Sequence, residues 1–197
     1  MTGPTTVKGQ RRRRDLIEAA AELLREGGPT NVSMRNVAKR VGSSLSATTY
    51  YFKSADELLE EAGRLNIGLW AERAERVADE AEAGEPPATL EEAMELVLRA
   101  TLPKRAPLLG HYSQLIAAGT SEPVTRAYNT GRNRLNLAVA RVLKVSKIEF
   151  PAELVISVVD GAAVSALSEG RDVHQTARKY LQELLAECVR RGRLSLG

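Results

Sequence analysis

The sequence predicts an all-α fold, and three observations support this prediction. Apolar residues recur at three- and four-residue steps along most of the chain, which is the period of an amphipathic helix. No segment alternates β-branched residues between hairpin turns. The 197 residues are 27% charged and 43% hydrophobic, as in ordinary globular proteins that fold around a core. We therefore expect nine helices separated by short turns.

The first helix is predicted from Arg12 to Glu26. Gly27, Gly28 and Pro29 follow and end it, because glycine relaxes the backbone and proline lacks an amide donor. The apolar residues of this helix fall on one face and predict a buried side. They are Leu16, Ala19, Ala20, Leu23 and Leu24.

Two short helices follow, and a serine precedes each of them. Ser33 stands before a helix from Met34 to Val41, which Gly42 ends. Ser44 stands before a helix from Leu45 to about Tyr51. A serine at such a position accepts a hydrogen bond from a backbone amide of the first turn, so both are predicted N-caps.

A long fourth helix is predicted from Ala55 towards Glu82, about 40 Å at 1.5 Å per residue. Residues 54–57 form a capping box before it, and Gly-Glu-Pro-Pro at 84–87 is the clearest interruption of the chain. A second capping box at 89–92 starts the next helix. The remaining helices are predicted over residues 90–102, 104–118, 122–145, 151–168 and 173–191.

Basic charge is concentrated at the start of the chain. Residues 1–53 contain ten lysines and arginines but four acidic residues, whereas the other 144 residues contain 18 basic and 21 acidic ones. The overall charge of +3 hides this asymmetry. A basic segment on an acidic body is what binding to phosphate requires, although such clusters also arise without a partner.

Residues 33–52 have the dimensions of a helix-turn-helix. A short helix is followed by a turn with Gly42 and by a second short helix that is rich in small and hydroxyl side chains. A core helix would show large aliphatic residues instead. Small side chains let the backbone approach a base edge, and hydroxyls bond to bases or phosphates. The sequence therefore predicts that residues 45–51 enter the major groove of DNA.

The chain contains SMRNVAKRVG at 33–42, ATTYYFKS at 47–54 and ELL at 57–59. With these motifs, residues from about 10 to 60 resemble the DNA-binding domain of the TetR family of repressors. The plan of nine helices agrees over the whole chain, but the motif is limited to the first 60 residues. The resemblance implies a three-helix head over residues 1–54. It also implies that a long fourth helix leads into an effector-binding and dimerisation bundle over residues 55–197.

The resemblance also implies roles for the residues of the helix-turn-helix. Arg35 reaches a base from the second helix, Tyr50 and Tyr51 bind phosphates, and residues 45, 46, 47 and 49 face bases. Phe52 packs the third helix onto the first and the fourth. The predicted DNA-binding set is Arg35, Ser44, Leu45, Ser46, Ala47, Thr48, Thr49, Tyr50, Tyr51 and Lys53.

One position departs from the family pattern. Many relatives have a phosphate-binding lysine at the start of the fourth helix, where this chain has Ala55. Lys53 lies two residues earlier and is the residue that can compensate.

A run of four arginines, Arg11, Arg12, Arg13 and Arg14, begins just ahead of the first predicted helix. We expect them to form an arm that enters the minor groove or contacts phosphates, because arginine is attracted to the negative potential of a narrow groove. A solvated, disordered tail is the alternative.

The last two predicted helices are expected to form a four-helix bundle with a second subunit. The resemblance implies this bundle, and the eighth helix is apolar nearly all round, so it must be covered. A monomer core is the alternative, but a two-fold dimer would place two recognition helices about 34 Å apart on a palindromic site. The predicted interface residues are Val155, Val159, Ala162, Ala166, Ala177, Leu181, Leu184 and Cys188.

A small-molecule effector is a further partner that the resemblance implies, bound among helices 4 to 8. Five of the eight aromatic residues lie beyond the head, which favours an aliphatic or mixed cavity. For each candidate, an ordinary helical position is the more frequent case. The candidate pocket residues are Trp70, His111, Tyr112, Gln114, Tyr128, Arg132 and Asn133.

Asp160 is an acidic residue in the middle of the apolar eighth helix. We expect it to pair across the dimer, to meet a ligand cation or to face solvent, in that order, because a buried charge without a partner is costly.

Catalysis, metal binding and membrane insertion find no support in the sequence. Cys188 is the single cysteine, which excludes an intrachain disulfide and fits a reducing cytoplasm. The two histidines have no second ligand or nucleophile at a useful spacing. No run approaches the roughly 20 apolar residues of a membrane helix. We therefore expect a cytoplasmic protein that is not an enzyme and that has no metal and no cofactor.

The sequence thus favours a homodimeric, sequence-specific transcription regulator, a repressor that a small molecule releases from a palindromic operator. The alternative is a helical enzyme or small-molecule carrier whose basic head is incidental. Residues 47–52 together with the basic head separate the two classes, because an enzyme has no need for them.

Overall fold

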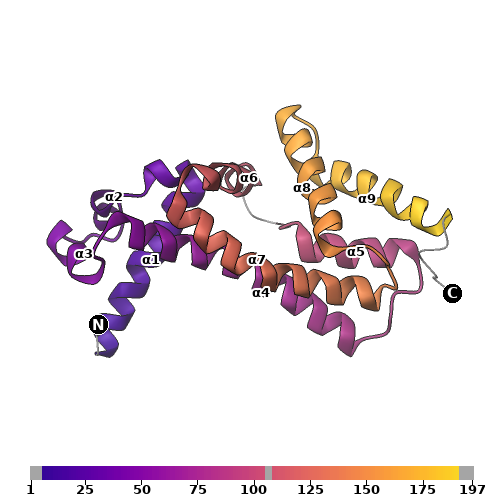
Figure 1. Ribbon diagram of the computed structural model, residues 1–197, viewed down its shortest axis with the longest axis horizontal. Coiled ribbons are helices and arrows are strands. Elements are labelled where there is room, and N and C mark those ends of the chain that lie inside the picture. The colour runs from indigo at the N-terminus through magenta and orange to yellow at the C-terminus, as the bar shows by residue number, and fades with distance from the viewer. Residues whose placement is uncertain (1–5, 105–107, 191–197) are drawn as a thin grey trace. The chain divides into compact units, whose positions relative to one another are not determined.

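The computed structural model describes residues 6–104 and 108–190, with side chains up to residue 186. These residues form nine α-helices and two short 3-10 turns, at Pro29–Asn31 and Ala118–Thr120 (Figure 1). The prediction of an all-α fold is confirmed for this part of the chain. The helices are α1 (Val7–Gly27), α2 (Met34–Arg40), α3 (Leu45–Tyr51), α4 (Ala55–Ala83), α5 (Leu90–Thr101), α6 (Leu108–Ala117), α7 (Glu122–Val145), α8 (Ala152–Ser168) and α9 (Val173–Arg190).

The described residues pack into two compact units. The head unit consists of those within 1–69 and 107–131, and the body unit of those within 70–106 and 132–197. Helices α4 and α7 therefore contribute to both units. The functional boundary after residue 54 stays a prediction, because it concerns activity rather than packing.

Helix α1 begins at Val7, five residues before the predicted start at Arg12. The Thr6 hydroxyl caps it by accepting a hydrogen bond of 3.1 Å from the Gly9 amide. Arginine has a high helix propensity, so residues 11–14 continue the helix instead of forming a separate segment. The prediction of an arm before the first helix is wrong: Arg11, Arg12, Arg13 and Arg14 all lie within α1.

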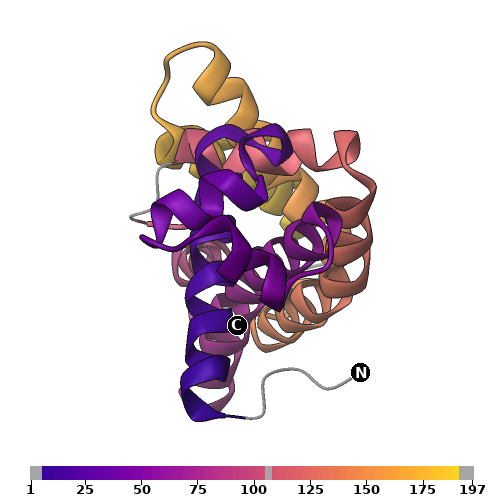
Figure 2. The same ribbon diagram turned by 90° about the vertical axis from the view of Figure 1, so that its left-hand side faces the viewer.

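The turn between α2 and α3 is fixed by backbone hydrogen bonds. Ser33 and Ser44 are the N-caps of the two helices, as predicted. At the end of α2, the Ser43 amide donates to the Ala38 carbonyl and the Gly42 amide to the Lys39 carbonyl, which together make a Schellman motif. This motif needs the φ of +61° at Gly42, a value that glycine adopts without strain. The pair α2–α3 faces the viewer in Figure 2.

Helices α4, α6 and α7 complete the head unit. The start of α4 is capped as predicted, with the Glu57 amide donating to the Ser54 hydroxyl at 3.1 Å. Helix α6 packs against α1 so closely that a Cβ at Gly110 would lie 2.8 Å from the Arg25 carbonyl oxygen. The predicted start of this helix at residue 104 is wrong, since α6 begins at Leu108; residues 105–107 lie outside the described part.

The body unit is built around α8 and α9, which pack against each other and against α5. The capping box that starts α5 at Thr89 is present, as predicted. Pro151 is the N-cap of α8 rather than its first residue. The Asp172 carboxylate accepts a hydrogen bond of 2.7 Å from the Gln175 amide at the start of α9.

Candidate DNA interface

Helix α3 presents one polar face to solvent and turns the other into the head unit. Tyr50 is 78% exposed and Leu45 is 45% exposed. Ser44, Ser46, Thr49 and Lys53 are also exposed, while Ala47 and Tyr51 are half-buried. Most of the predicted DNA-binding set therefore lies where a partner can reach it.

Thr48 is the exception in the predicted DNA-binding set. Its side chain is fully buried, and its hydroxyl donates a hydrogen bond of 3.3 Å to the Ser44 carbonyl. Thr48 lies on the face of α3 that packs against the core. Its assignment to the DNA surface was therefore wrong.

Local hydrogen bonds orient the hydroxyl groups on the exposed face of α3. The Ser44 and Ser46 hydroxyl oxygens lie 3.0 Å apart, and the Thr49 hydroxyl donates to the Ser46 carbonyl at 3.0 Å. The rings of Tyr50 and Tyr51 meet edge to face with centroids 5.1 Å apart. These contacts restrict the rotamers of the side chains that are expected to meet DNA.

Phe52 anchors the end of α3 in the core. It is 1% exposed, which confirms its assignment as a packing residue. The Arg13 guanidinium lies 5.0 Å from the centroid of the Phe52 ring and donates a hydrogen bond of 2.7 Å to Glu61. Arg13 therefore serves the structure of the head.

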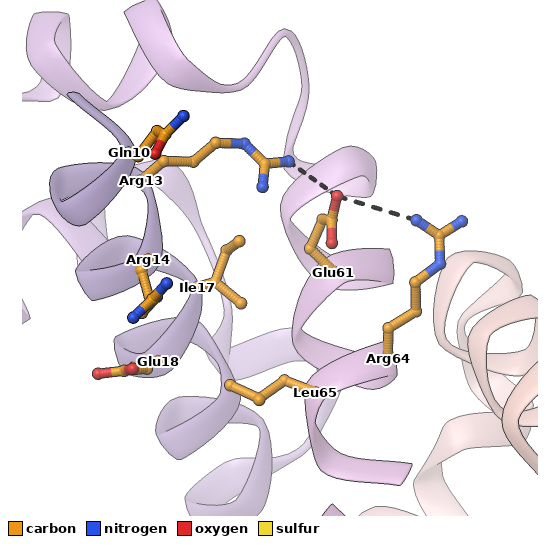
Figure 3. A pocket seen from close by; sticks show the side chains of 8 residues that line it. All are labelled: Gln10, Arg13, Arg14, Ile17, Glu18, Glu61, Arg64 and Leu65. Carbon is orange, nitrogen blue, oxygen red and sulfur yellow. Dashed lines mark hydrogen bonds and ion pairs between the residues drawn. The ribbon is translucent and has the colours of Figure 1, made fainter. Parts of the chain in front are cut away.

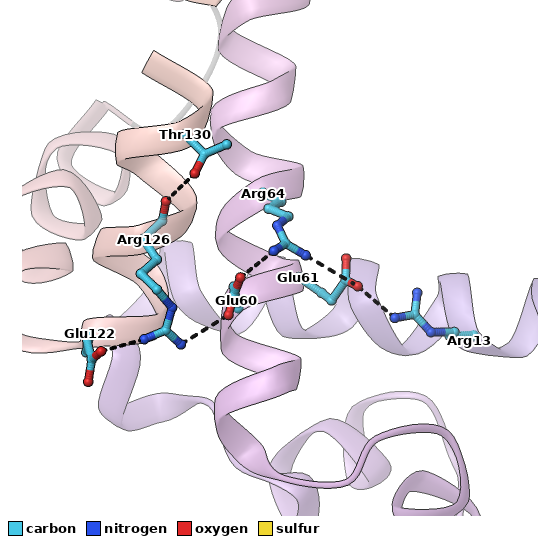
Figure 4. Close-up of polar contacts among 7 residues, drawn as sticks. All are labelled: Arg13, Glu60, Glu61, Arg64, Glu122, Arg126 and Thr130. Atoms are coloured by element: carbon cyan, nitrogen blue, oxygen red, sulfur yellow. Dashed lines mark hydrogen bonds and ion pairs between the residues drawn. The ribbon is translucent and has the colours of Figure 1, made fainter. Parts of the chain in front are cut away.

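Glu61 is part of a chain of ion pairs that joins three helices of the head unit (Figure 4). Arg64 bridges Glu61 and Glu60 on α4. Glu60 in turn accepts a hydrogen bond of 3.1 Å from Arg126 of α7. Residues of α1, α4 and α7 are thus linked from Arg13 to Arg126.

Two arginines of α2 differ in whether they are free to contact DNA. Arg40 donates hydrogen bonds to Glu22 at 3.2 Å and to Glu26 at 2.6 and 2.9 Å, which ties α2 to α1. Arg35 is exposed and has no ion-pair or hydrogen-bond partner among the described residues. Its predicted role at a base edge is compatible with this position and stays a prediction.

At the start of α4, Ala55 is half-buried and Lys53 is exposed. The Lys53 amide donates to the Glu57 carboxylate at 2.8 Å, which fixes the backbone at this residue. Compensation by Lys53 for the missing lysine stays a prediction.

Sequence reasoning missed Lys8, which lies on α1 beside the recognition segment. Lys8, Arg11 and Arg12 line a hollow together with Ser43, Ala47 and Tyr51. Thr6 was the signal that could have revealed Lys8, because an N-cap at this residue starts α1 at Val7. A helix that starts there places residues 8, 11 and 12 on one face.

Two of the candidate effector residues belong to a buried polar cluster in the head unit. The Gln114 carbonyl oxygen accepts hydrogen bonds from Asn66 at 2.8 Å and from the Tyr128 hydroxyl at 3.2 Å. Arg25 donates to the Asn66 carbonyl oxygen, and burial raises the pKa of Tyr128. The Gln114 amide nitrogen is buried and has no hydrogen-bond partner among the described residues. Asn66 and Arg25 were not among the predicted residues.

The other candidate effector residues are dispersed. His111 and Tyr112 are buried in the head unit with ring centroids 4.8 Å apart. Trp70 is buried in the body unit, whereas Asn133 is exposed there.

Asp160 pairs within its own chain. Its carboxylate lies 3.8 Å from the guanidinium of Arg132, another candidate effector residue. This pair was not among the three expected outcomes for Asp160, because the sequence does not show that α7 places an arginine beside α8.

Six of the eight predicted dimer residues lie on buried faces of their helices. They are buried inside the body unit, where α8 packs on α9, and are not available to a second subunit. Leu184 is half-buried, and the side chain of Cys188 lies outside the described part. A helix that is apolar nearly all round does not reveal which face its own chain covers. The six buried residues are Val155, Val159, Ala162, Ala166, Ala177 and Leu181.

A different stripe of α8 is exposed. Leu154 is 43% exposed and Val164 is 37% exposed. Gly161, between them, is exposed, and a Cβ there would meet no atom of the described part of the chain within 4 Å. Val158 on the same stripe is half-buried.

No helix in the described part of the chain is long and apolar enough to cross a membrane. The same residues contain no group of three or more His, Cys, Asp or Glu side chains that could hold a metal ion.

Comparison with known proteins identifies the helix-turn-helix region. Residues 16–62 match the profile of the bacterial regulatory proteins of the tetR family. The HTH-type transcriptional regulator PksA of Bacillus subtilis (strain 168) is 39% identical over 62 residues, which are 32% of this chain and 30% of the relative. The chain therefore matches less than a third of the length of that relative.

Solved structures extend the similarity to the fold of the chain. A transcriptional regulator of Saccharomonospora viridis in complex with choline is 21% identical and has a TM-score of 0.70, covering 90% of this chain and 96% of its own. A TetR-family regulator of Mesorhizobium loti is 16% identical with a TM-score of 0.68, covering 92% and 98%. At these identities the likeness concerns the fold. Residues 16–62 are therefore similar to the bacterial regulatory proteins of the tetR family, and the chain as a whole shares the fold of these solved regulators.

Proposed function

We propose that the protein is a cytoplasmic, homodimeric transcription regulator that binds a palindromic operator and is released from it by a small-molecule effector. Repression is the mode of action that follows from release by an effector. The observation that carries the proposal is the division of α3 into an exposed face with Leu45, Ser46, Thr49 and Tyr50 and a buried face with Thr48.

The exposed face of α3 supports sequence-specific DNA binding. Ser46 and Thr49 offer hydroxyls to base edges, and the small side chain of Ala47 permits a close approach to the groove. The exposed Tyr50 hydroxyl suits a phosphate, which positions the helix without reading sequence. Base and phosphate contacts thus have separate donors on one short helix.

The exposed stripe of α8 supports a dimer. Leu154, Val158, Gly161 and Val164 follow one another at steps of four, three and three residues and make one continuous face. An apolar face of this kind is costly in water, and a second copy of the same face buries it by two-fold symmetry. This stripe replaces the interface predicted from the sequence.

The buried polar cluster supports an effector site in the head unit. A buried amide donor without an acceptor costs about 1–3 kcal/mol, and an effector with an acceptor group would remove that cost at Gln114. Gln114 also bonds Asn66 and Tyr128, which come from α4 and α7. An effector at Gln114 would therefore act on α4, the helix that follows α3.

The test of DNA binding is an electrophoretic mobility shift with the DNA upstream of the protein's own gene. We expect a dimer to bind a palindromic segment selectively, and we expect rising salt concentration to weaken the complex. Binding that is equally strong on unrelated DNA of the same length would contradict the proposal.

Two substitutions separate the proposed roles at the interface. Tyr50→Ala should weaken binding on all sequences, because a phosphate contact carries no base information. Arg35→Ala should also relax the preference at one base position, which binding to a set of single-base operator variants measures. Equal losses for both variants on every operator would contradict these roles.

The test of the effector site is a screen of uncharged small molecules with carbonyl acceptors for release of the labelled operator. Gln114→Leu should retain operator affinity and lose the response to any compound that releases the wild-type protein. A full response of this variant would place the effector elsewhere.

A further inference from the structure

A hollow of about 580 Å³ lies between the first turns of α1 and the helix-turn-helix. Its cationic side comes from Lys8, Arg11 and Arg12 of α1. Its other side comes from Ala47 and Tyr51 of α3 and from the turn before it. The hollow therefore adjoins the helix that is proposed to enter the major groove.

Helical geometry brings these three cations together. Arg11 and Arg12 follow Lys8 at three and four residues, which places all three on one face of α1. Arg12 is held in place, because it donates a hydrogen bond of 3.5 Å to the Val41 carbonyl before the turn. Lys8 and Arg11 are exposed and have no ion-pair or hydrogen-bond partner among the described residues.

The last two arginines of the run, Arg13 and Arg14, face a different hollow. They line a second hollow of about 730 Å³ between α1 and α4, together with Glu18 and Glu61 (Figure 3). Arg13 is engaged by Glu61 there. The four consecutive arginines thus serve two different surfaces, and only Arg11 and Arg12 adjoin α3.

The charge of the hollow beside α3 defines its ligand. Three cations face a single carboxylate, that of Asp15, whose oxygen lies 4.0 Å from the Arg12 guanidinium. Hydroxyl groups of Ser43 and Tyr51 add neutral hydrogen-bond donors. An anion with several acceptor oxygens satisfies such a set, and a phosphodiester of DNA is the anion found beside a helix in the major groove.

We propose that this hollow binds a backbone phosphate of the operator, with Lys8 and Arg11 as its principal ligands and Arg12 as a fixed third cation. The proposal rests on the proposed function, since it assumes operator binding through α3. A phosphate held here fixes the position of α1 and α3 together along the DNA backbone. It contributes affinity without sequence preference.

The test measures binding of the labelled operator by fluorescence anisotropy at a series of salt concentrations. We expect Lys8→Ala and Arg11→Ala each to weaken binding roughly threefold or more and to reduce the salt slope by about one per subunit bound. The loss should be the same on all single-base operator variants. Arg11→Lys should keep the slope, because the charge remains.

Arg14→Ala is the matched comparison, because it removes the same charge from a residue of α1 that lines the second hollow and not the one beside α3. We expect it to retain the wild-type salt slope. Thermal unfolding verifies that each variant is folded, and Lys8→Gln and Arg11→Gln provide a second pair that retains side-chain bulk.

Three results would overturn the phosphate site while leaving operator binding intact. One is unchanged affinity and slope in the Lys8 and Arg11 variants, and another is an equal loss of slope in Arg14→Ala. The third is a change of base preference in Arg11→Ala at an A·T-rich flank, which would show a minor-groove contact. Absence of selective binding by the wild-type protein would instead count against the proposed function.

Discussion

The guanidinium of Arg13 donates a hydrogen bond of 2.7 Å to the carboxylate of Glu61, and this bond joins α1 to α4. Both side chains are largely shielded from solvent, with exposed fractions of 29% and 26%. The same guanidinium covers the ring of Phe52. One arginine thus fixes the end of the recognition helix and the start of the long helix in a single arrangement.

We expect Arg13→Ala to lower the free energy of unfolding by about 1–2 kcal/mol, because it removes both the bond to Glu61 and the contact with Phe52. Urea denaturation measures this value. Arg14→Ala serves as the control and should leave stability within about 0.5 kcal/mol of the wild type. A double-mutant cycle with Glu61→Gln should give a coupling of at least about 0.5 kcal/mol; additive effects would mean that the pair is not an energetic contact.

The position of Arg13 also shows what the sequence predicts well and what it does not. Periodicity and capping residues predicted the helices, because Ser33, Ser44 and Thr89 act within their own turns. The arginine run was misplaced because one capping residue, Thr6, determines where α1 begins. The partners of Arg13 are distant in sequence, so no local pattern reveals them.

The burial of Thr48 leads to a prediction for base recognition. Thr48→Val keeps the shape of the buried side chain and loses its hydroxyl, so base preference should stay unchanged while stability falls by about 1 kcal/mol. Thr49→Val removes an exposed hydroxyl and should alter the preference for at least one base pair. Binding to single-base operator variants and urea denaturation measure the two effects. A changed base preference in Thr48→Val would contradict the orientation of α3.

The link between α2 and α1 should weaken in acid. Hydrogen bonds from Arg40 hold the pKa of Glu26 below its ordinary value of 4.5. A carboxyl with a lowered pKa stabilises the fold above the pKa of the unfolded chain, and this contribution disappears as pH falls through the folded-state pKa. Stability should therefore fall less steeply in Glu26→Gln than in the wild type between about pH 6 and pH 3.

Urea denaturation at several pH values measures this difference. Arg40→Gln is a matched variant, since it removes the partner and should flatten the same part of the pH profile. Profiles of equal slope in all three proteins would show that the ion pair is not formed in solution.

The exposed stripe of α8 could not be predicted from the sequence, although the helix itself could. The sequence shows that α8 is apolar nearly all round, but packing on α9 decides which face the chain covers. That packing buries Val155 and Val159 and leaves Leu154 and Val164 exposed. The face of an interface therefore has to be found from the folded chain, whereas the helix that carries it can be predicted.

Substitution of this stripe tests the dimer. Leu154→Glu and Val164→Glu should each convert the dimer to monomer, because each would place carboxylates without a partner in an apolar interface. Analytical ultracentrifugation measures the mass, and operator affinity should fall with dimerisation because one head reads half of the site. Leu137→Glu is the control: Leu137 is 58% exposed on α7, outside the stripe, and its substitution should leave the dimer intact. Dimers that persist in both α8 variants, with monomers in Leu137→Glu, would assign the interface to α7 instead.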